Sequence, residues 1–181
     1  MKSILTFFIP AVLLSACQAN APKTETASEP PKDSTSAAAP ADLPFTASYT
    51  SNWNDNVSDA DLKTVLTSYK DWADGNLQGL GKAFGDSVDV DMSDGHHFRK
   101  SNADLMKMWG NYRDSLSGVK MDFASWHKMY AKDKNDIYIV TWYDETDTYK
   151  NGKVDSATYH DINRLKDGKI VWYSQYKRVK K

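Results

Sequence analysis

The sequence has little cysteine, no excess charge of either sign and no long apolar run, and each shortage excludes a class of protein. Its 181 residues include one Cys, which excludes a disulfide scaffold and a cysteine-rich zinc site. Lys and Arg number 23 against 24 Asp and Glu. A protein that binds nucleic acid through bulk charge is far more basic, so we expect no nucleic-acid partner.

The apolar run near the start, residues 4–14, is too short to cross a bilayer, which takes roughly 20 apolar residues. It follows Lys2 and contains Pro10. A positive start, a short apolar stretch and small residues before a cleavage site are typical of a secretory signal. We therefore predict that residues 1–16 are a signal peptide.

The end of this segment, Leu14-Ser15-Ala16-Cys17, resembles the bacterial lipobox. The resemblance implies that Cys17 is acylated and becomes the new N-terminus, with about 0.8 kcal/mol of membrane affinity for each buried methylene. Gln18 follows the Cys, at the position where an Asp would favour the inner membrane, so the resemblance suggests the outer membrane. We expect a lipid-anchored protein of the bacterial cell envelope, on the outer membrane and facing the periplasm, with the membrane as its partner. An ordinary signal peptide with an incidental Cys is the alternative.

Residues 17–44 are rich in Ala, Pro, Thr, Ser, Lys and Glu, and Leu43 is their only large aliphatic side chain. Such a segment cannot bury enough apolar area to offset its conformational entropy. We predict a disordered linker between the lipid and a domain. Every Trp, Tyr and His lies beyond residue 44, so residues 45–181 are the predicted domain, a normal size for one core.

The first half of this domain shows helical patterns. Ser58 and Asp61 form a capping pair before apolar residues at helical spacing, and Gly75 ends that helix. A weaker helix is predicted over 77–84, a half-buried strand over 88–92 and a third helix after the cap Ser101. Gly110 inside that third helix indicates close packing.

Beyond Gly118 the apolar period changes from 3.6 to 2 residues. Four long strands are predicted: Val119–Ala131, Ile137–Tyr149, Lys153–Leu165 and Lys169–Arg178. Asn151-Gly152 and Asp167-Gly168 between them are strong tight-hairpin signals. The pattern predicts an α+β fold with a long antiparallel meander and the helices gathered on one face.

This order of elements resembles the NTF2-like superfamily, and particularly its SnoaL-like branch. The residues that carry the resemblance are Asp74-Gly75-Asn76, Val88-Asp89-Val90 and the stretch from Asp161 to Ile170. It implies a cone: a curved antiparallel sheet with a four-strand meander, packed on about three N-terminal helices around a pocket. The superfamily includes isomerases, cyclases, hydrolases and proteins without known chemistry, so the fold does not decide the function.

The ketosteroid isomerase branch needs a carboxylate base, a Tyr and a protonated Asp. Aligned without gaps, its base position falls on Met92 and its Tyr position on Ser68, while Asp161 matches the Asp. Tyr69, one residue along, would replace the missing phenol only if the helix rotated by about 100°. We therefore expect no ketosteroid isomerase activity.

The resemblance also implies which side chains face the pocket. Because alternate strand residues share a face, Tyr159, Asp161 and Asn163 are expected to point inward together. Asp161 is the best catalytic candidate, and a structural carboxylate that accepts hydrogen bonds from Tyr or Trp is the alternative. Trp142 and Tyr173 are expected inward on their strands, and Trp109 in the pocket wall. In 119–131 the odd residues Met121, Phe123, His127 and Met129 look more core-like, although Trp126 leaves that parity open.

The histidines are the remaining candidates for chemistry. His96 and His97 are expected on a loop at the pocket mouth, where His97 would contact a ligand, and His127 would meet Asp161 across the sheet as an acid–base pair. We predict no metal site and no cofactor.

Three functions are compatible with these residues. The leading hypothesis is an envelope protein that binds a small, partly apolar molecule without transforming it. The second is an enzyme that uses Asp161 and a His for proton transfer. The third is a protein-interaction module, with a homodimer formed through the exposed sheet face.

Overall fold

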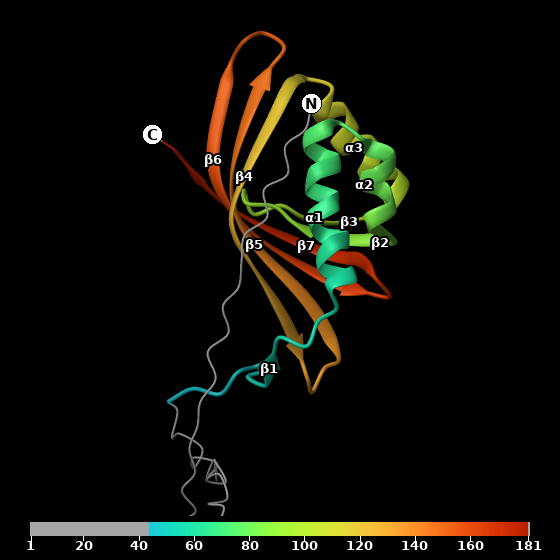
Figure 1. Ribbon diagram of the computed structural model, residues 1–181, viewed down its shortest axis with the longest axis vertical. Helices are drawn as coiled ribbons and strands as arrows, with labels where there is room; N and C mark the ends of the chain where they lie inside the picture. The colour runs from blue at the N-terminus through green and yellow to red at the C-terminus, as the bar shows by residue number, and fades with distance from the viewer. Residues whose placement is uncertain (1–43, 181) are drawn as a thin grey trace, which may run out of the picture. The chain divides into compact units, whose positions relative to one another are not determined.

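The computed structural model describes residues 44–180, which form a seven-stranded curved sheet with three helices on one face (Figure 1). The predicted signal peptide, Cys17 and nearly all of the predicted linker lie outside these residues. The helices are α1 (Asp59–Asp74), α2 (Leu77–Ala83) and α3 (Asn102–Arg113). The strands are β1 (Trp53–Asn54), β2 (Phe84–Asp91), β3 (His97–Ser101), β4 (Leu116–Ala131), β5 (Asp136–Tyr149), β6 (Val154–Lys166) and β7 (Lys169–Val179).

The strands follow the order β1-β4-β5-β6-β7-β2-β3. The meander β4–β7 is antiparallel throughout, which confirms the predicted α+β class and its four long strands. β2 pairs with β7 in parallel, so the sheet is mixed. β1 and β3 were not predicted, because two residues and a short charged edge strand carry almost no periodic signal.

The helix boundaries follow from the caps that the sequence indicates. The backbone N–H of Asp61 donates to Ser58 Oγ at 3.0 Å, and Gly75 ends α1 in the left-handed conformation with a φ of 74°. The N–H of Asp104 donates to Ser101 Oγ in the same way at the start of α3. Within α3, a Cβ on Gly110 would lie 2.8 Å from Leu77 Cδ1, so this glycine does allow close packing of α2.

One of the register shifts in the meander changes which later residues of β4 face the helices. The β4–β5 register shifts between Phe123 and Ser125, which adds one residue to β4. A bulge of this kind moves every later side chain to the opposite face. Met121 and Phe123 therefore pack inward as expected, whereas His127 lies outside; beyond the bulge Trp126 borders an inner hollow instead.

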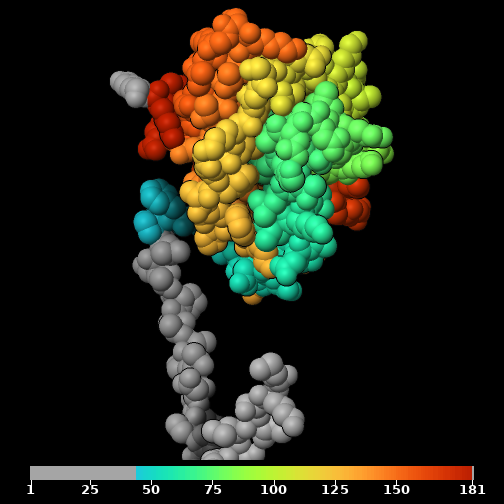
Figure 2. Space-filling view, turned by 45° about the horizontal axis from the view of Figure 1, so that its top comes forward, coloured from blue at the N-terminus to red at the C-terminus, as the bar shows by residue number. Residues whose placement is uncertain are grey.

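The core lies between the helices and the concave side of the sheet. Its fully buried side chains include Val65 of α1, Leu105 of α3, Ile139 of β5 and Ile170 of β7. Figure 2 shows α1 packed alongside β4. No helix within residues 44–180 is long and apolar enough to cross a membrane.

Candidate functional site

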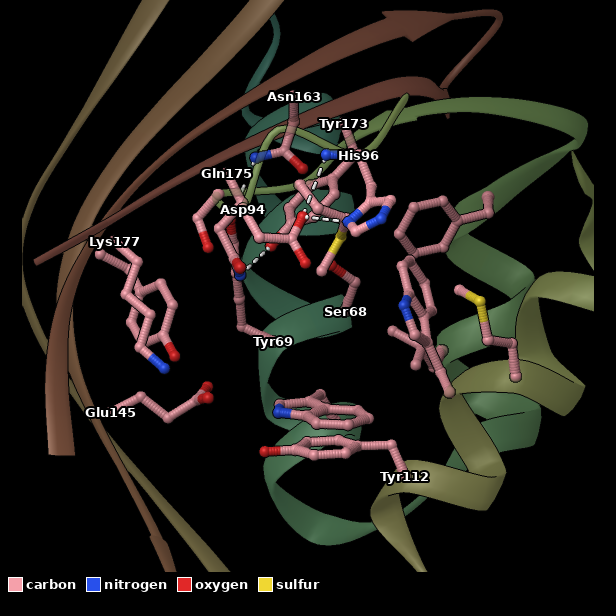
Figure 3. Close-up of a pocket in the computed structure, with 18 of the residues that line it drawn as sticks. Ser68, Tyr69, Asp94, His96, Tyr112, Glu145, Asn163, Tyr173, Gln175 and Lys177 are labelled. Carbon is pink, nitrogen blue, oxygen red and sulfur yellow. Dashed lines mark hydrogen bonds and ion pairs between the residues drawn. The ribbon is translucent and has the colours of Figure 1, made fainter. Parts of the chain in front are cut away.

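A cavity of about 560 Å³ opens between the helices and the concave face of the sheet (Figure 3). Aromatic and aliphatic side chains dominate its wall, and a few polar groups interrupt them. The lining residues are Ser68, Tyr69, Trp72, Leu80, Phe84, Met92, Ser93, Asp94, His96, Phe98, Met108, Trp109, Tyr112, Tyr143, Glu145, Tyr159, Asn163, Tyr173, Gln175 and Lys177.

Three phenols from this wall converge on one carboxylate oxygen. Asp161 Oδ2 accepts hydrogen bonds from Tyr143 at 2.7 Å, from Tyr173 at 2.9 Å and from Tyr69 at 3.0 Å. Burial raises the pKa of each of these phenols well above its ordinary value, so all three stay protonated and act as donors.

Asp161 itself is 0% exposed, so it lies behind the lining rather than in it. Burial raises the pKa of its carboxyl to about 7, although the three phenol hydrogen bonds oppose that rise. Its Oδ1 has no hydrogen-bond partner among residues 44–180. Asp161 is therefore a site for one proton that changes occupancy near neutral pH.

Two amides connect this buried group to the cavity. Gln175 Nε2 donates to the Tyr173 hydroxyl at 2.7 Å, and Asn163 Nδ2 donates to the Tyr69 hydroxyl at 3.1 Å (Figure 3). Both amides line the cavity. A ligand that hydrogen-bonds to either amide would thus be coupled to Asp161 through one phenol.

A second carboxyl lies in the cavity wall. Glu145 of β5 is only 9% exposed, and Figure 3 shows it pointing across the cavity towards Tyr112. Burial and the nearby Asp147 and Asp161 raise its pKa to about 8, against the lowering effect of a hydrogen bond from Trp72. With this pKa, Glu145 is largely uncharged at pH 7 even with Lys177 nearby.

The turn between β2 and β3 lies at the cavity mouth. It carries His96, whose Nδ1 lies 2.9 Å from Asp94 Oδ1. Both side chains line the cavity, yet both remain mostly exposed to solvent. Within residues 44–180, no group of three or more His, Cys, Asp or Glu side chains is arranged to hold a metal ion.

The structure brings several of the sequence-predicted residues together. Tyr159, Asn163, Tyr173 and Trp109 all line the cavity, and Asp161 lies directly behind it on the inward face of β6. The alternation along β6 thus places Tyr159, Asp161 and Asn163 on one face, as expected.

Three other expectations are wrong. Trp142 lies on the outer face of the sheet, because the inward residues of β5 are odd-numbered: Thr141 pairs with Asp161. His127, turned outward by the bulge, packs edge-on against Trp142 and cannot pair with Asp161. His97 is the first residue of β3, and its Nδ1 lies 2.6 Å from Asp91 Oδ1 outside the cavity. His96 lines the cavity mouth instead.

Three residues of the cavity wall were not predicted from the sequence: Glu145, Trp72 and Tyr143. The helical spacing of Trp72 placed it on the apolar face of α1 without showing what that face meets. Tyr143 and Glu145 would have followed from the correct parity of β5. A charged residue in a strand ordinarily faces solvent, so Glu145 carried no sign of its burial.

Comparison with known proteins gives structural neighbours only. No family model matches the sequence, and no curated protein matches it. An epoxide hydrolase from M. tuberculosis, described as LEH-like, is 10% identical with a TM-score of 0.56, over 67% of this chain and 84% of that one. An NTF2-like protein of unknown function from Exiguobacterium is 16% identical with a TM-score of 0.52, over 64% and 98%. A protein with a ketosteroid isomerase-like fold from Catenulispora acidiphila, solved with trimethylamine, is 14% identical with a TM-score of 0.50, over 63% and 84%.

The fold is NTF2-like. At these identities the likeness shows the fold and no activity. Met92 and Ser68, onto which the gap-free alignment puts the base and the Tyr of ketosteroid isomerases, both line the cavity. Met92 cannot accept a proton, and the Ser68 hydroxyl donates to the Val65 carbonyl at 2.7 Å. Tyr69, expected to face away, does supply a phenol, since it donates to Asp161.

Proposed function

We propose that this chain is a lipid-anchored cell-envelope protein whose NTF2-like domain binds a small, partly apolar molecule in its cavity. The observation that carries the proposal is the cavity of about 560 Å³, walled by aromatic rings and interrupted by a few polar groups. Small-molecule sites have this size and this mixture of apolar wall and sparse polar contacts. A solved protein of the same fold was crystallised with a small molecule, trimethylamine.

The envelope location rests on the sequence alone. Leu14-Ser15-Ala16-Cys17 ends a short apolar segment as a lipoprotein signal does, and Gln18 favours the outer membrane. Acylation of Cys17 would anchor the domain through residues 17–44.

An acid–base enzyme is the second candidate, because the pKa of Asp161 lies near 7 and the Asp94–His96 pair lies at the cavity mouth. Two observations favour binding instead. Asp161 is fully buried with Oδ2 occupied by three phenols, so its carboxylate does not reach the cavity directly. His127 and His97, the histidines expected to act with it, lie outside the cavity.

Native mass spectrometry of the protein released from its own membranes tests the binding proposal. We expect a small molecule at about one per chain on the wild type, and its loss in Met108→Trp, which fills the cavity from α3. Lys107→Trp is the matched control, because it adds the same indole to the exposed side of that helix. Equal ligand content in the two variants would exclude the cavity as the binding site.

A further inference from the structure

The end of the cavity around Glu145 differs in chemistry from the rest of its wall. Glu145, Trp72 and Tyr112 line it, and Asp147 follows two residues later on the same face of β5. We infer that this end receives a positively charged group of the ligand, an organic ammonium, so that the ligand is an amphipathic amine. This inference rests on the proposed function, since it names the ligand class of the same cavity.

Two buried acid groups, one of them with an unpartnered oxygen, give the first argument. Glu145 is more than nine-tenths buried and points across the cavity. Asp147 is 5% exposed; its Oδ2 accepts from Tyr112 at 2.9 Å, while its Oδ1 is buried without a partner among residues 44–180. Such groups are costly to bury unless a proton or a cation compensates them.

Aromatic faces give the second argument. The rings of Trp72 and Tyr112 stack with centroids 6.0 Å apart and an interplanar angle of 2°. Both residues line the cavity, so this aromatic pair forms part of its wall. An ammonium group is attracted to the face of an aromatic ring, most strongly to Trp and more strongly when desolvated.

Lys177 gives the third argument, because it places a cation at this end already. Its ammonium lies 5.5 Å from the centroid of the Tyr159 ring, and its charge lowers the pKa of Glu145 and Asp147. The side chain is exposed on the last strand and can leave without disturbing the core. A bound ammonium would therefore compete with the Lys177 ammonium for the carboxyls of Glu145 and Asp147.

The charges at this end favour a cationic group over the opposite assignment, an anionic ligand held by Lys177. Asp147 and Asp161 both raise the pKa of Glu145, whereas Lys177 and a hydrogen bond from Trp72 lower it. The facing phenols Tyr112 and Tyr159 stay neutral, since burial raises their pKa. An anion would meet these carboxyls across an apolar cavity, while a cation would draw the proton off Glu145 and pair with it.

Two isosteric probes test the inference on the full chain in detergent. The first is 4-(hydroxymethyl)phenyltrimethylammonium, and the second is its uncharged carbon analogue 4-tert-butylbenzyl alcohol. Neither titrates between pH 6 and pH 9, so any pH dependence belongs to the protein. Isothermal titration calorimetry gives both affinities, with micelles alone as the blank and melting curves as the folding check.

We expect the wild type to bind the ammonium probe about tenfold or more tightly than the analogue at pH 9. The preference for the ammonium probe should fall towards pH 6 by a factor that can approach about 100. The reason is that Glu145 is protonated at pH 6. Glu145→Gln should reduce the preference and flatten its pH dependence, because the aromatic rings of Trp72 and Tyr112 still attract the ammonium. Lys177→Gln, an exposed substitution, should strengthen ammonium binding.

Equal affinities of the wild type for the two probes at pH 9 would overturn the inference and leave the proposed cavity function standing. A preference that is undiminished in Glu145→Gln, or weaker ammonium binding in Lys177→Gln, would also overturn it. Absence of binding by either probe, together with no co-purified molecule, would overturn the proposed function as well.

Discussion

The Tyr143 hydroxyl donates a 2.7 Å hydrogen bond to Asp161 Oδ2 across the β5–β6 pair. Tyr173 and Tyr69 complete the set of donors from β7 and α1. One buried carboxyl thus joins three strands and a helix at the back of the cavity. Its protonation is coupled to the position of each phenol, and all three phenols line the cavity.

Asp161→Asn separates the binding hypothesis from the acid–base hypothesis. If Asp161 positions the phenols, the free energy of unfolding and the ligand affinity should each change by no more than about 1–2 kcal/mol. If it transfers protons, turnover should drop by roughly a hundredfold while binding survives. Chemical denaturation and calorimetry measure the first pair, and Asp161→Leu is the control that also removes the polar atoms.

Tyr143→Phe removes one donor and keeps the ring. Because the phenol hydrogen bonds lower the pKa of Asp161, its pKa should rise above about 7 in this variant. Carbon-13 NMR titration of the Asp161 carboxyl measures the shift. Tyr138→Phe is the control, since its hydroxyl bonds to Tyr49 far from Asp161. An unchanged titration would show that this bond is not made in solution.

Much of the fold was predictable from the sequence because its signals are local. Ser58 and Ser101 cap helices, Gly75 adopts the left-handed conformation, and Asp167-Gly168 turns with φ values of 51° and 71°. These features depend on neighbouring residues alone. The four strands of the meander followed from their turns and their period.

The site was less predictable because it depends on which face of each strand points inward. Along β6, the resemblance to the NTF2-like superfamily predicted the inward face correctly, with Asp161 and Asn163 on it. In β5 both Ile139 and Val140 are buried, so apolar character does not distinguish the two faces. The bulge after Phe123 leaves no mark in the sequence, which is why His127 was assigned to the wrong side.

Cys17→Ala tests the anchor. The variant should lack the acyl group and should no longer partition with membranes, because residues 4–14 are too short to span a bilayer. Detergent phase partitioning and intact-mass measurement check both points. Wild-type protein that keeps residues 1–16, or that is soluble without detergent, would contradict the lipoprotein prediction.

Deletion of residues 18–43 tests the domain boundary. Their composition gives almost no apolar area to bury, so the deletion should barely change the melting temperature of the remaining domain. Scanning calorimetry of the full chain and of the deletion variant makes the comparison. A loss of several degrees would show that this segment packs on the domain.

The stability of the domain should fall as the pH rises. Asp161 and Glu145 have ordinary pKa values of 3.8 and 4.5, and burial raises them to about 7 and about 8. Between the ordinary and the raised pKa of each group, the folded protein still holds a proton that the unfolded chain has released. Each unit by which the pH rises therefore lowers the free energy of unfolding. The decline should amount to a few kcal/mol between pH 5 and pH 8.5 and then level off.

Urea denaturation at fixed temperature across this pH range measures the decline. The double variant Asp161→Asn with Glu145→Gln should show a much flatter profile, and Asp122→Asn, which removes an exposed carboxyl, should keep the wild-type slope. A wild-type profile that rises with pH would mean that these two carboxyls are charged in the folded protein.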